Sequence, residues 1–299
     1  MTVIQNPING YRYMTFNTRR QPMDSIAFRQ AIATLIDKEF VTQNVLQGVA
    51  HPANTFVAPG NAAWYNGDVP LWGMNEDGNA MSSGERVAKA VELLSAAGFS
   101  WEAGSPPVYN EESQQTENVS RLLLPDGQPV PDLKLLAPVP SYDPLRSTFA
   151  IWIERWMQDI GIPVTTDLKA FNVLRNQMVL EQDFDIALAG WSVGIFPNDL
   201  QAFFHSDRTD KGDFNSGGYS NPEFDQLADE ILTCATYEDC KTVADNLQQI
   251  LSNELPYVVL FETGIIEAFR GDALQYPYTE TLSGLQYLGG LPTVVSVQN

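Results

Sequence analysis

Residues 133–190 read LKLLAPVPSYDPLRSTFAIWIERWMQDIGIPVTTDLKAFNVLRNQMVLEQDFDIALAG, and this stretch decides the fold. It contains three short apolar runs, LKLLA (133–137), IPVTTDL (162–168) and FDIALAG (184–190), separated by two segments of helical length. Apolar runs of strand length that alternate with amphipathic helices are typical of βαβ units in a parallel sheet. The sequence therefore predicts an α/β fold with a βαβαβ core.

Further helices and strands extend this core in both directions. A capping box from Ser82 to Glu85, glycine stops and i, i+3, i+4 apolar spacing mark the helices. Short runs rich in β-branched and aromatic residues mark the strands. We expect helices near 24–36, 39–47, 82–97, 145–160, 171–181, 222–233 and 238–252, and strands at 11–17 and 257–261.

Composition excludes several classes of partner. The net charge is −20, from 37 acidic and 17 basic residues, so neither nucleic acid nor an anionic membrane surface is an expected partner. The composition is 44% apolar and 18% charged, as in globular proteins. No apolar run is long enough to cross a bilayer. The N-terminus lacks a basic stretch followed by an apolar run, so we expect no export signal in this chain.

Two cysteines, Cys234 and Cys240, lie between two predicted helices in the segment CATYEDC. A disulfide that joins the end of one helix to the start of the next would suit an exported protein. Two reduced thiols in a cytosolic chain are the alternative, and the spacing alone does not decide between them.

The segment Gly190-Trp191-Ser192-Val193-Gly194 fits the G-x-S-x-G motif of serine hydrolases and follows a strand. A hydrolase of that fold needs an acid and then a histidine later in the chain. His205 follows, with Asp199 between, but thirteen residues leave no room for further strand–helix units. A serine hydrolase that uses Ser192 is therefore the alternative function rather than the first one.

Metal binding has little support in the sequence. His51 and His205 are the two histidines, and neither has a histidine or cysteine at ligand spacing. Asp207, Asp210 and Asp213 miss the alternation of an EF-hand loop. We expect no metal and no cofactor.

A ligand-binding crevice is the remaining hypothesis, because open α/β sheets bind ligands beyond the carboxyl ends of their strands. Those ends lead here into PVPSYDP (138–144) and WSVGIFPND (191–199). Aromatic walls with a few polar groups suit small-molecule recognition. Two interpretations of Trp191 stay open at this point: it contacts the ligand, or it packs against the end of the sheet as part of the core. The candidate ligand-binding residues are Tyr142, Trp191, Ser192, Phe196, Asn198 and Asp199.

Five segments, in order, resemble the second lobe of family 5 extracellular solute-binding proteins, the oligopeptide-, dipeptide- and nickel-type receptors of ABC importers. The first of them starts with FNTRRQPMDSIAFRQAIATLIDKEF, and the third starts with DFDIALAGWSVGIFPNDL. Together the resemblance covers nearly the whole chain apart from an insertion near 100–120. No single segment is specific, but their order is. The segments are 16–53, 143–164, 183–206, 217–231 and 255–270.

The resemblance implies a lobe of a type II periplasmic-binding-protein fold, in which two lobes close on a ligand about a hinge. Residues 1–270 would form the second, C-terminal lobe, and 271–299 a tail that returns toward a first lobe missing from this fragment. It further implies an extracytoplasmic, monomeric receptor that binds a peptide, oligosaccharide or similar solute without chemistry and delivers it to an ABC permease. A cytosolic regulator built on the same lobe, with a DNA-binding module outside this chain, stays open, and two free thiols would favour it.

One position departs from the pattern of the family. Its peptide receptors carry an aspartate three residues after the tryptophan of this motif, where it pairs with the α-amino group of the peptide. That position is Gly194 here, and the nearest acid is Asp199. The departure makes an oligosaccharide or another neutral ligand as good a candidate as a peptide.

Overall fold

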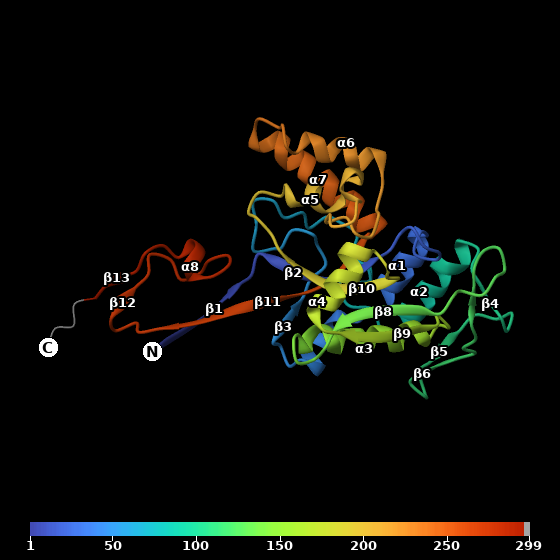
Figure 1. The fold of residues 1–299 in the computed structure, drawn as a ribbon. Helices are drawn as coiled ribbons and strands as arrows, with labels where there is room; N and C mark the ends of the chain where they lie inside the picture. Colours follow the sequence, from blue (N-terminus) through green and yellow to red (C-terminus); the bar gives the residue numbers. More distant parts are fainter. Residues whose placement is uncertain (296–299) are drawn as a thin grey trace.

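A mixed sheet carries helices on both faces, and a ribbon projects from one edge of it (Figure 1). The computed structural model describes residues 1–295. The strands are β1 (Thr2–Pro7), β2 (Gly10–Phe16), β3 (Ala50–Pro52), β8 (Leu133–Pro138), β9 (Val164–Lys169), β10 (Ile186–Ser192) and β11 (Tyr257–Phe269). Their order in the sheet is β1-β11-β2-β10-β8-β9, and β3 also pairs with β11.

The predicted βαβαβ core is confirmed. Strand β8 lies parallel to both β9 and β10, and α3 (Pro144–Gln158) and the helical segment α4–η2 make the crossovers. Segment α4–η2 consists of α4 (Phe171–Arg175) and a π-helical turn, η2 (Asn176–Glu181). The sheet is parallel only there, because β2 and β11 join it antiparallel to their neighbours.

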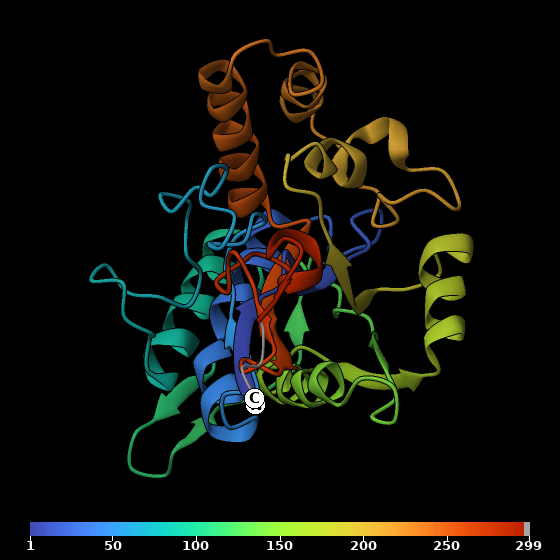
Figure 2. The same ribbon diagram turned by 90° about the vertical axis from the view of Figure 1, so that its left-hand side faces the viewer.

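Side chains alternate between the two faces of the sheet and build two cores. On β2, Met14 and Phe16 enter one core, while Tyr11 and Tyr13 enter the other. The first core is covered by α1 (Ile26–Leu35), α2 (Ser83–Ala96) and α3. The second is covered by η2, α5 (Asp199–Phe204), α6 (Pro222–Glu230) and α7 (Tyr237–Glu254). Helices α5, α6 and α7, in gold and orange, lie together at the top of Figure 2.

Local signals placed most helix ends correctly. Helix α2 begins with the predicted capping box of Ser82 and Glu85. The N-cap of α1 is Ser25, one residue after the expected start at Asp24, and its side chain accepts a hydrogen bond from the backbone N–H of Phe28. The segment expected as a helix at 39–47 is the π-helical turn η1 (Phe40–Val45).

The insertion between α2 and β8 forms two small hairpins. Strands β4 (Ser100–Trp101) and β7 (Leu122–Leu123) pair in one, and β5 (Val108–Asn110) and β6 (Gln115–Glu117) in the other. The indole N–H of Trp101 donates to the carbonyl of Ile160 at 2.8 Å, which ties the insertion to the end of α3.

The ribbon combines both ends of the described chain. Strand β1 pairs with the outer half of β11, from Gly264 to Phe269. Beyond it lie β12 (Leu274–Gln275), α8 (Leu285–Leu288) and β13 (Thr293–Val294) (Figure 1). The backbone N–H of Ser283 donates to the carbonyl of Pro7 at 2.8 Å, so the described part of the predicted tail folds back on β1. Residues 296–299 of that tail lie outside the described residues.

Cys234 and Cys240 are joined in the structure, with their Cα atoms 5.3 Å apart, across the link between α6 and α7. We expect Ellman titration of unfolded, non-reduced protein to detect no free thiol. Because the closed loop is short, Cys234→Ser should lower the free energy of unfolding by only about 2 kcal/mol. Two titratable thiols in protein made under oxidising conditions would contradict the prediction.

Lys38 is buried, and its ammonium has no carboxylate partner among residues 1–295. Its Nζ donates to the carbonyl of Ala53 at 3.0 Å and to Oδ1 of Asn54 at 2.6 Å. Burial, assisted by the nearby charge of Arg86, lowers the pKa of Lys38 to about 7. The unfolded chain, with an ordinary lysine pKa, therefore binds a proton above pH 7 that the folded chain releases.

Stability should consequently rise with pH above about 7, because the unfolded state binds more protons there. Between about pH 7 and pH 9 the free energy of unfolding of the wild type should gain about 2 kcal/mol relative to Lys38→Met, which cannot titrate at this position. Urea unfolding at both pH values measures the difference. Equal gains in the two proteins would show that Lys38 keeps an ordinary pKa.

Candidate functional site

The carboxyl end of β10 is pinned to the start of β2. The side-chain amide of Asn9 donates to the carbonyls of Val193 (3.0 Å) and Gly194 (2.8 Å), and the N–H of Val193 donates back to the carbonyl of Asn9 (3.0 Å). Glycine is needed at position 10, where β2 begins beside the end of β10, because its φ is +157° and a Cβ there would overlap the carbonyl oxygen of Trp191. The turn that follows β10 is therefore held in place by residues far away in the sequence.

A crevice of about 380 Å³ opens between this turn and the ribbon. One wall is the end of β10 and its turn, where Ser192 is exposed, and the other is the ribbon with α8. The lining is mainly apolar, with the side chains of Asn9, Ser192 and Ser283 and the hydroxyl of Tyr287 as its polar groups. The lining residues are 8–9, 192–195, 265, 282–283 and 287–288.

Trp191 lies on the face of β10 opposite to Ser192, as alternation along a strand requires. Its ring stacks on Phe203 with centroids 4.4 Å apart and meets the edge of Phe214 at 5.5 Å. Tyr13 stacks behind it at 6.0 Å. The ring is half-buried, and its indole N–H, which is buried, has no hydrogen-bond partner among residues 1–295. Trp191 thus packs on the second core and keeps one part of its surface open.

Asp199 closes the turn after β10. Its Oδ2 accepts a hydrogen bond from the backbone N–H of Gly194 at 2.6 Å, so one carboxylate oxygen is already engaged. Phe196 is 37% exposed and lies edge-on to Trp64 at 5.2 Å. Asn198 is exposed on the same turn. These three candidates share one loop with Ser192, but the structure gives each a different surrounding.

Tyr142 belongs to a neighbouring group at the end of β8. Its ring is 53% exposed, stacks on Phe171 at 4.6 Å and lies 5.8 Å from the guanidinium of Arg146. Asp143 accepts from Nε of Arg146 at 2.7 Å and lies 4.0 Å from Nε of Arg12. Tyr142 does not line the crevice.

Arg12 is a residue of this surface that the sequence did not single out. Burial and the neighbouring charge of Arg146 lower its pKa, and Asp143 opposes that shift. In GYRYMTF (10–16) Arg12 shares a face with Met14 and Phe16, a polar residue at the start of an otherwise buried stripe. That break in the pattern was the available signal.

The sequence of the chain decides its relationship to known proteins. Residues 1–215 match the model of bacterial extracellular solute-binding proteins, family 5 Middle, which covers more than half of the chain. The chain belongs to this family.

Family 5 relatives are distant in sequence. The oligopeptide-binding protein AppA of Bacillus subtilis is 24% identical over 256 residues, which are 84% of this chain and 41% of AppA. The peptide transport periplasmic protein SapA of Salmonella typhimurium is 23% identical over 266 residues, 87% of this chain and 40% of SapA. The chain therefore spans about two fifths of the length of these relatives.

Solved structures share the fold. AppA from Bacillus subtilis, in complex with a nonapeptide, superposes with a TM-score of 0.73 at 21% identity, over 99% of this chain and 52% of AppA. A periplasmic EDTA-binding protein, EppA, gives a TM-score of 0.71 at 18% identity, over 99% and 50%. The predicted type II periplasmic-binding-protein fold is confirmed by this agreement.

The geometry does not support the serine hydrolase alternative. Ser192 makes no side-chain hydrogen bond within residues 1–295, and Nδ1 of His205 accepts from the backbone N–H of Asp207 at 3.0 Å. Six residues of turn, rather than a helix, follow Ser192 before α5 begins at Asp199. In this structure the G-x-S-x-G segment is the end of β10 and the turn that follows it.

Two searches of the described residues gave negative results. Within residues 1–295 no group of three or more histidine, cysteine, aspartate or glutamate side chains is placed to hold a metal ion. None of the helices in this range is both long and apolar enough to span a bilayer.

Proposed function

We propose that this chain is one ligand-binding lobe of the substrate-binding component of an ABC importer. The observation that carries the proposal is the mainly apolar crevice at the carboxyl end of β10, in a chain that belongs to family 5. The lobe binds a solute reversibly and does no chemistry. Membership of an extracellular family supports an extracytoplasmic place. A permease as partner and a monomeric receptor are parts of the same proposal.

The division into lobes follows from the same reading. Residues 1–270 form the second lobe, and the segment from 271 onward leads toward a first lobe. The ribbon supports this division, because β1 and the outer half of β11 project from the sheet in one direction (Figure 1). The match covers 52% of the AppA chain, so a receptor of that length has enough further residues to form the other lobe.

A peptide is the first candidate for the solute, because the relatives AppA and SapA are described as oligopeptide-binding and peptide transport proteins. The ligand surface comprises the crevice and the open part of the Trp191 ring. Mass spectrometry of small molecules that remain bound to the purified receptor tests the proposal. A peptide or similar solute should be released on denaturation, and covalent labelling of Ser192 by a fluorophosphonate would contradict a purely binding role.

A neutral solute such as an oligosaccharide is the second candidate, favoured by Gly194. A Cβ at Gly194 would meet Oδ2 of Asp199 and the carbonyl oxygen of Phe196 at 3.6 Å each, so space for a side chain exists but no acid occupies it. The two candidates differ in their need for an α-amino group. Equal affinity for a peptide and its N-acetylated form would favour recognition without that group, whereas a strong preference for the free amine would assign that role to another acid.

In the complete receptor that we propose, Trp191→Ala should weaken solute binding by about 1–3 kcal/mol, the range for a truncated aromatic anchor. Isothermal titration measures the affinity and urea unfolding the stability. Trp72→Ala is the matched control, because Trp72 is a half-buried tryptophan that neither lies on β10 nor lines the crevice. Unchanged affinity with a large loss of stability would show that Trp191 serves the core alone.

A further inference from the structure

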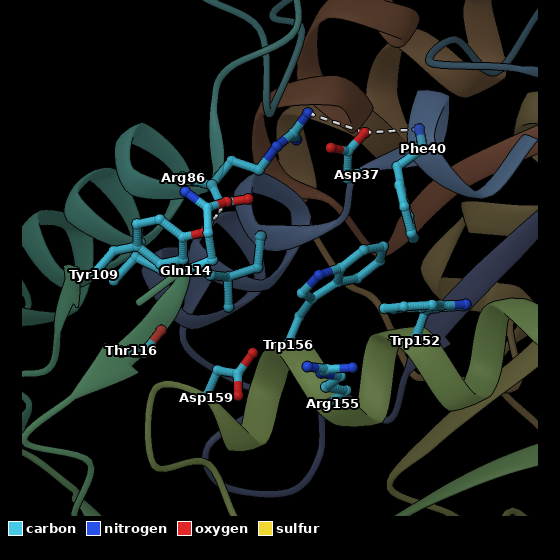
Figure 3. A pocket seen from close by; sticks show the side chains of 13 residues that line it. Asp37, Phe40, Arg86, Tyr109, Gln114, Thr116, Trp152, Arg155, Trp156 and Asp159 are labelled. Atoms are coloured by element: carbon cyan, nitrogen blue, oxygen red, sulfur yellow. Dashed lines mark hydrogen bonds and ion pairs between the residues drawn. The ribbon is translucent and has the colours of Figure 1, made fainter. Parts of the chain in front are cut away.

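A second cavity, of about 230 Å³, lies on the flank of the lobe. Helix α3 supplies one wall, α2 and η1 supply others, and the β5–β6 hairpin of the insertion covers one side (Figure 3). Part of this cavity is therefore built by the segment near 100–120 that the family resemblance did not cover.

The flank pocket is separate from the crevice. Asp143, which caps the N-terminus of α3, belongs to the charged group beside the carboxyl ends of the parallel strands. Asp159, at the C-cap of α3, lines the flank pocket. The fifteen residues of the helix place these two ends about 22 Å apart. The two cavities share no lining residue.

The floor of the flank pocket is aromatic. Phe40 meets Trp152 edge-on at 4.7 Å, and the rings of Trp152 and Trp156 lie 5.8 Å apart. Both tryptophans are half-buried, so part of each ring is open to the cavity. Figure 3 shows Trp156 at the centre of the pocket, with Tyr109 on the opposite wall. Such a floor offers flat apolar surface to a ring-shaped ligand.

Besides Ser83 and the hydrogen bond of 3.1 Å from the Tyr109 hydroxyl to Oε1 of Gln114, the polar groups of the pocket fall into two sets. Arg86 and Asp37 form an ion pair at 3.3 Å, and the guanidinium also donates to the carbonyls of Met81 (3.0 Å) and Ile36 (3.1 Å). These two residues hold α2 against the end of α1, and their bonding capacity is largely used.

The second set can form hydrogen bonds with a ligand, although the guanidinium of Arg155 also lies over the ring of Trp152, 5.5 Å from its centroid. The side chains of Thr116, Arg155 and Asp159 make no hydrogen bond or ion pair within residues 1–295, yet all three line the cavity. Burial raises the pKa of the Asp159 carboxyl, and the charge of Arg155 opposes that rise. A half-buried carboxylate with a guanidinium and a hydroxyl beside it offers both acceptors and donors at the edge of the aromatic floor.

We propose that the flank pocket binds a single neutral sugar ring. The C–H face of a pyranose packs on Trp156, while its hydroxyls donate to Asp159 and accept from Arg155. Opposite charges at Arg155 and Asp159 leave the pocket without net charge, which suits a neutral ligand better than a phosphate. An amino-acid zwitterion matches the two charges, but its ammonium and carboxylate lose more hydration on entering a half-buried aromatic site than sugar hydroxyls do.

Saturation-transfer difference NMR tests the proposal with glucose, galactose, mannose and N-acetylglucosamine as probes. Leucine and inorganic phosphate represent the zwitterionic and anionic alternatives. At least one sugar should bind with a millimolar dissociation constant. Asp159→Asn should weaken that binding on the order of tenfold, the loss expected for one charge-assisted hydrogen bond. Asp167→Asn, on β9, is the matched control and should leave binding unchanged.

The variants separate this pocket from other sites on the chain. Trp156→Ala should abolish sugar saturation transfer, and Asp159→Asn keeps the test valid if the tryptophan variant does not fold. Three results would overturn the proposal: no transfer from any of the four sugars, binding that survives Asp159→Asn, or stronger binding of leucine or phosphate. Sugar binding lost on Trp191→Ala but kept on Asp159→Asn would place the sugar in the crevice and would also overturn it. The outcome is independent of the importer proposal.

Discussion

Replacing Arg29 with methionine should lower the free energy of unfolding by about 4 kcal/mol. Arg29 is 3% exposed, and its guanidinium donates to the carbonyls of Glu254 (2.6 Å), Leu255 (3.0 Å) and Met23 (2.7 Å). The first two are carbonyls at the end of α7, which have no partner within their own helix. Methionine fills much of the space but donates nothing, so buried acceptors lose their partners.

Relief of burying a charge offsets part of this cost. Burial lowers the pKa of Arg29 to about 10, with Glu254 opposing the shift, so the side chain is still charged at neutral pH. Urea unfolding measures the difference, and Arg175→Met, at an exposed position on α4, is the control with the same chemical change. A loss below about 1 kcal/mol would show that the carbonyls at the end of α7 find other partners.

This chain alone should fold but bind a pool of nonapeptides with millimolar affinity or not at all. Two cores cover both faces of its sheet, so it can fold without another lobe. Its crevice, however, is one wall of the proposed site. If the absent wall contributes about 4 kcal/mol of contact, its loss weakens binding about a thousandfold.

Calorimetry and titration of the same sample check both halves of this prediction. A cooperative thermal transition shows that the lobe has folded, so weak binding cannot be attributed to an unfolded chain. Trp191→Ala should then change little, because there is little affinity to lose. Micromolar or tighter binding by the isolated chain would mean that its crevice is a complete site and that the two-lobe proposal is wrong.

Local patterns in the sequence were sufficient for the βαβαβ core and the longer helices, but not for α5, which lies in a stretch where no helix was expected. The βαβαβ core follows from alternating periods of apolar residues, and the capping box at Ser82 needs only neighbours within one helical turn. The error at the start of α1 is also local, because Asp24 and Ser25 are adjacent residues that can both cap a helix. Patterns of this kind are read within one segment at a time.

Contacts between segments that are far apart in the sequence could not be predicted from local patterns. Pairing of β1 with the outer half of β11 joins the two ends of the described chain, and the tail folds onto the same ribbon. The antiparallel entry of β2 and β11 into the sheet has no local signature either. Such pairings depend on which strand edges remain free once the core has formed.

The candidate site shows the same division. The strand rule directs attention to the residues after β8 and β10, and Ser192 does line the crevice. The rule does not show that Asp199 bonds back to Gly194, or that Asn9 fixes the turn. Nor does it show that Tyr142 joins Arg12, Asp143 and Arg146. Assignment of ligand contacts to these residues stays a prediction.

The central place of β2 has a consequence for how the protein is made. Its residues precede those of both neighbours, β10 and β11, by most of the described sequence, although all three lie side by side in the sheet. Pairings so far apart along a chain form slowly. A nascent chain that has not yet reached Tyr257 carries β2 with one edge unpaired. Until the later residues emerge from the ribosome, that edge is open to pairing with other chains.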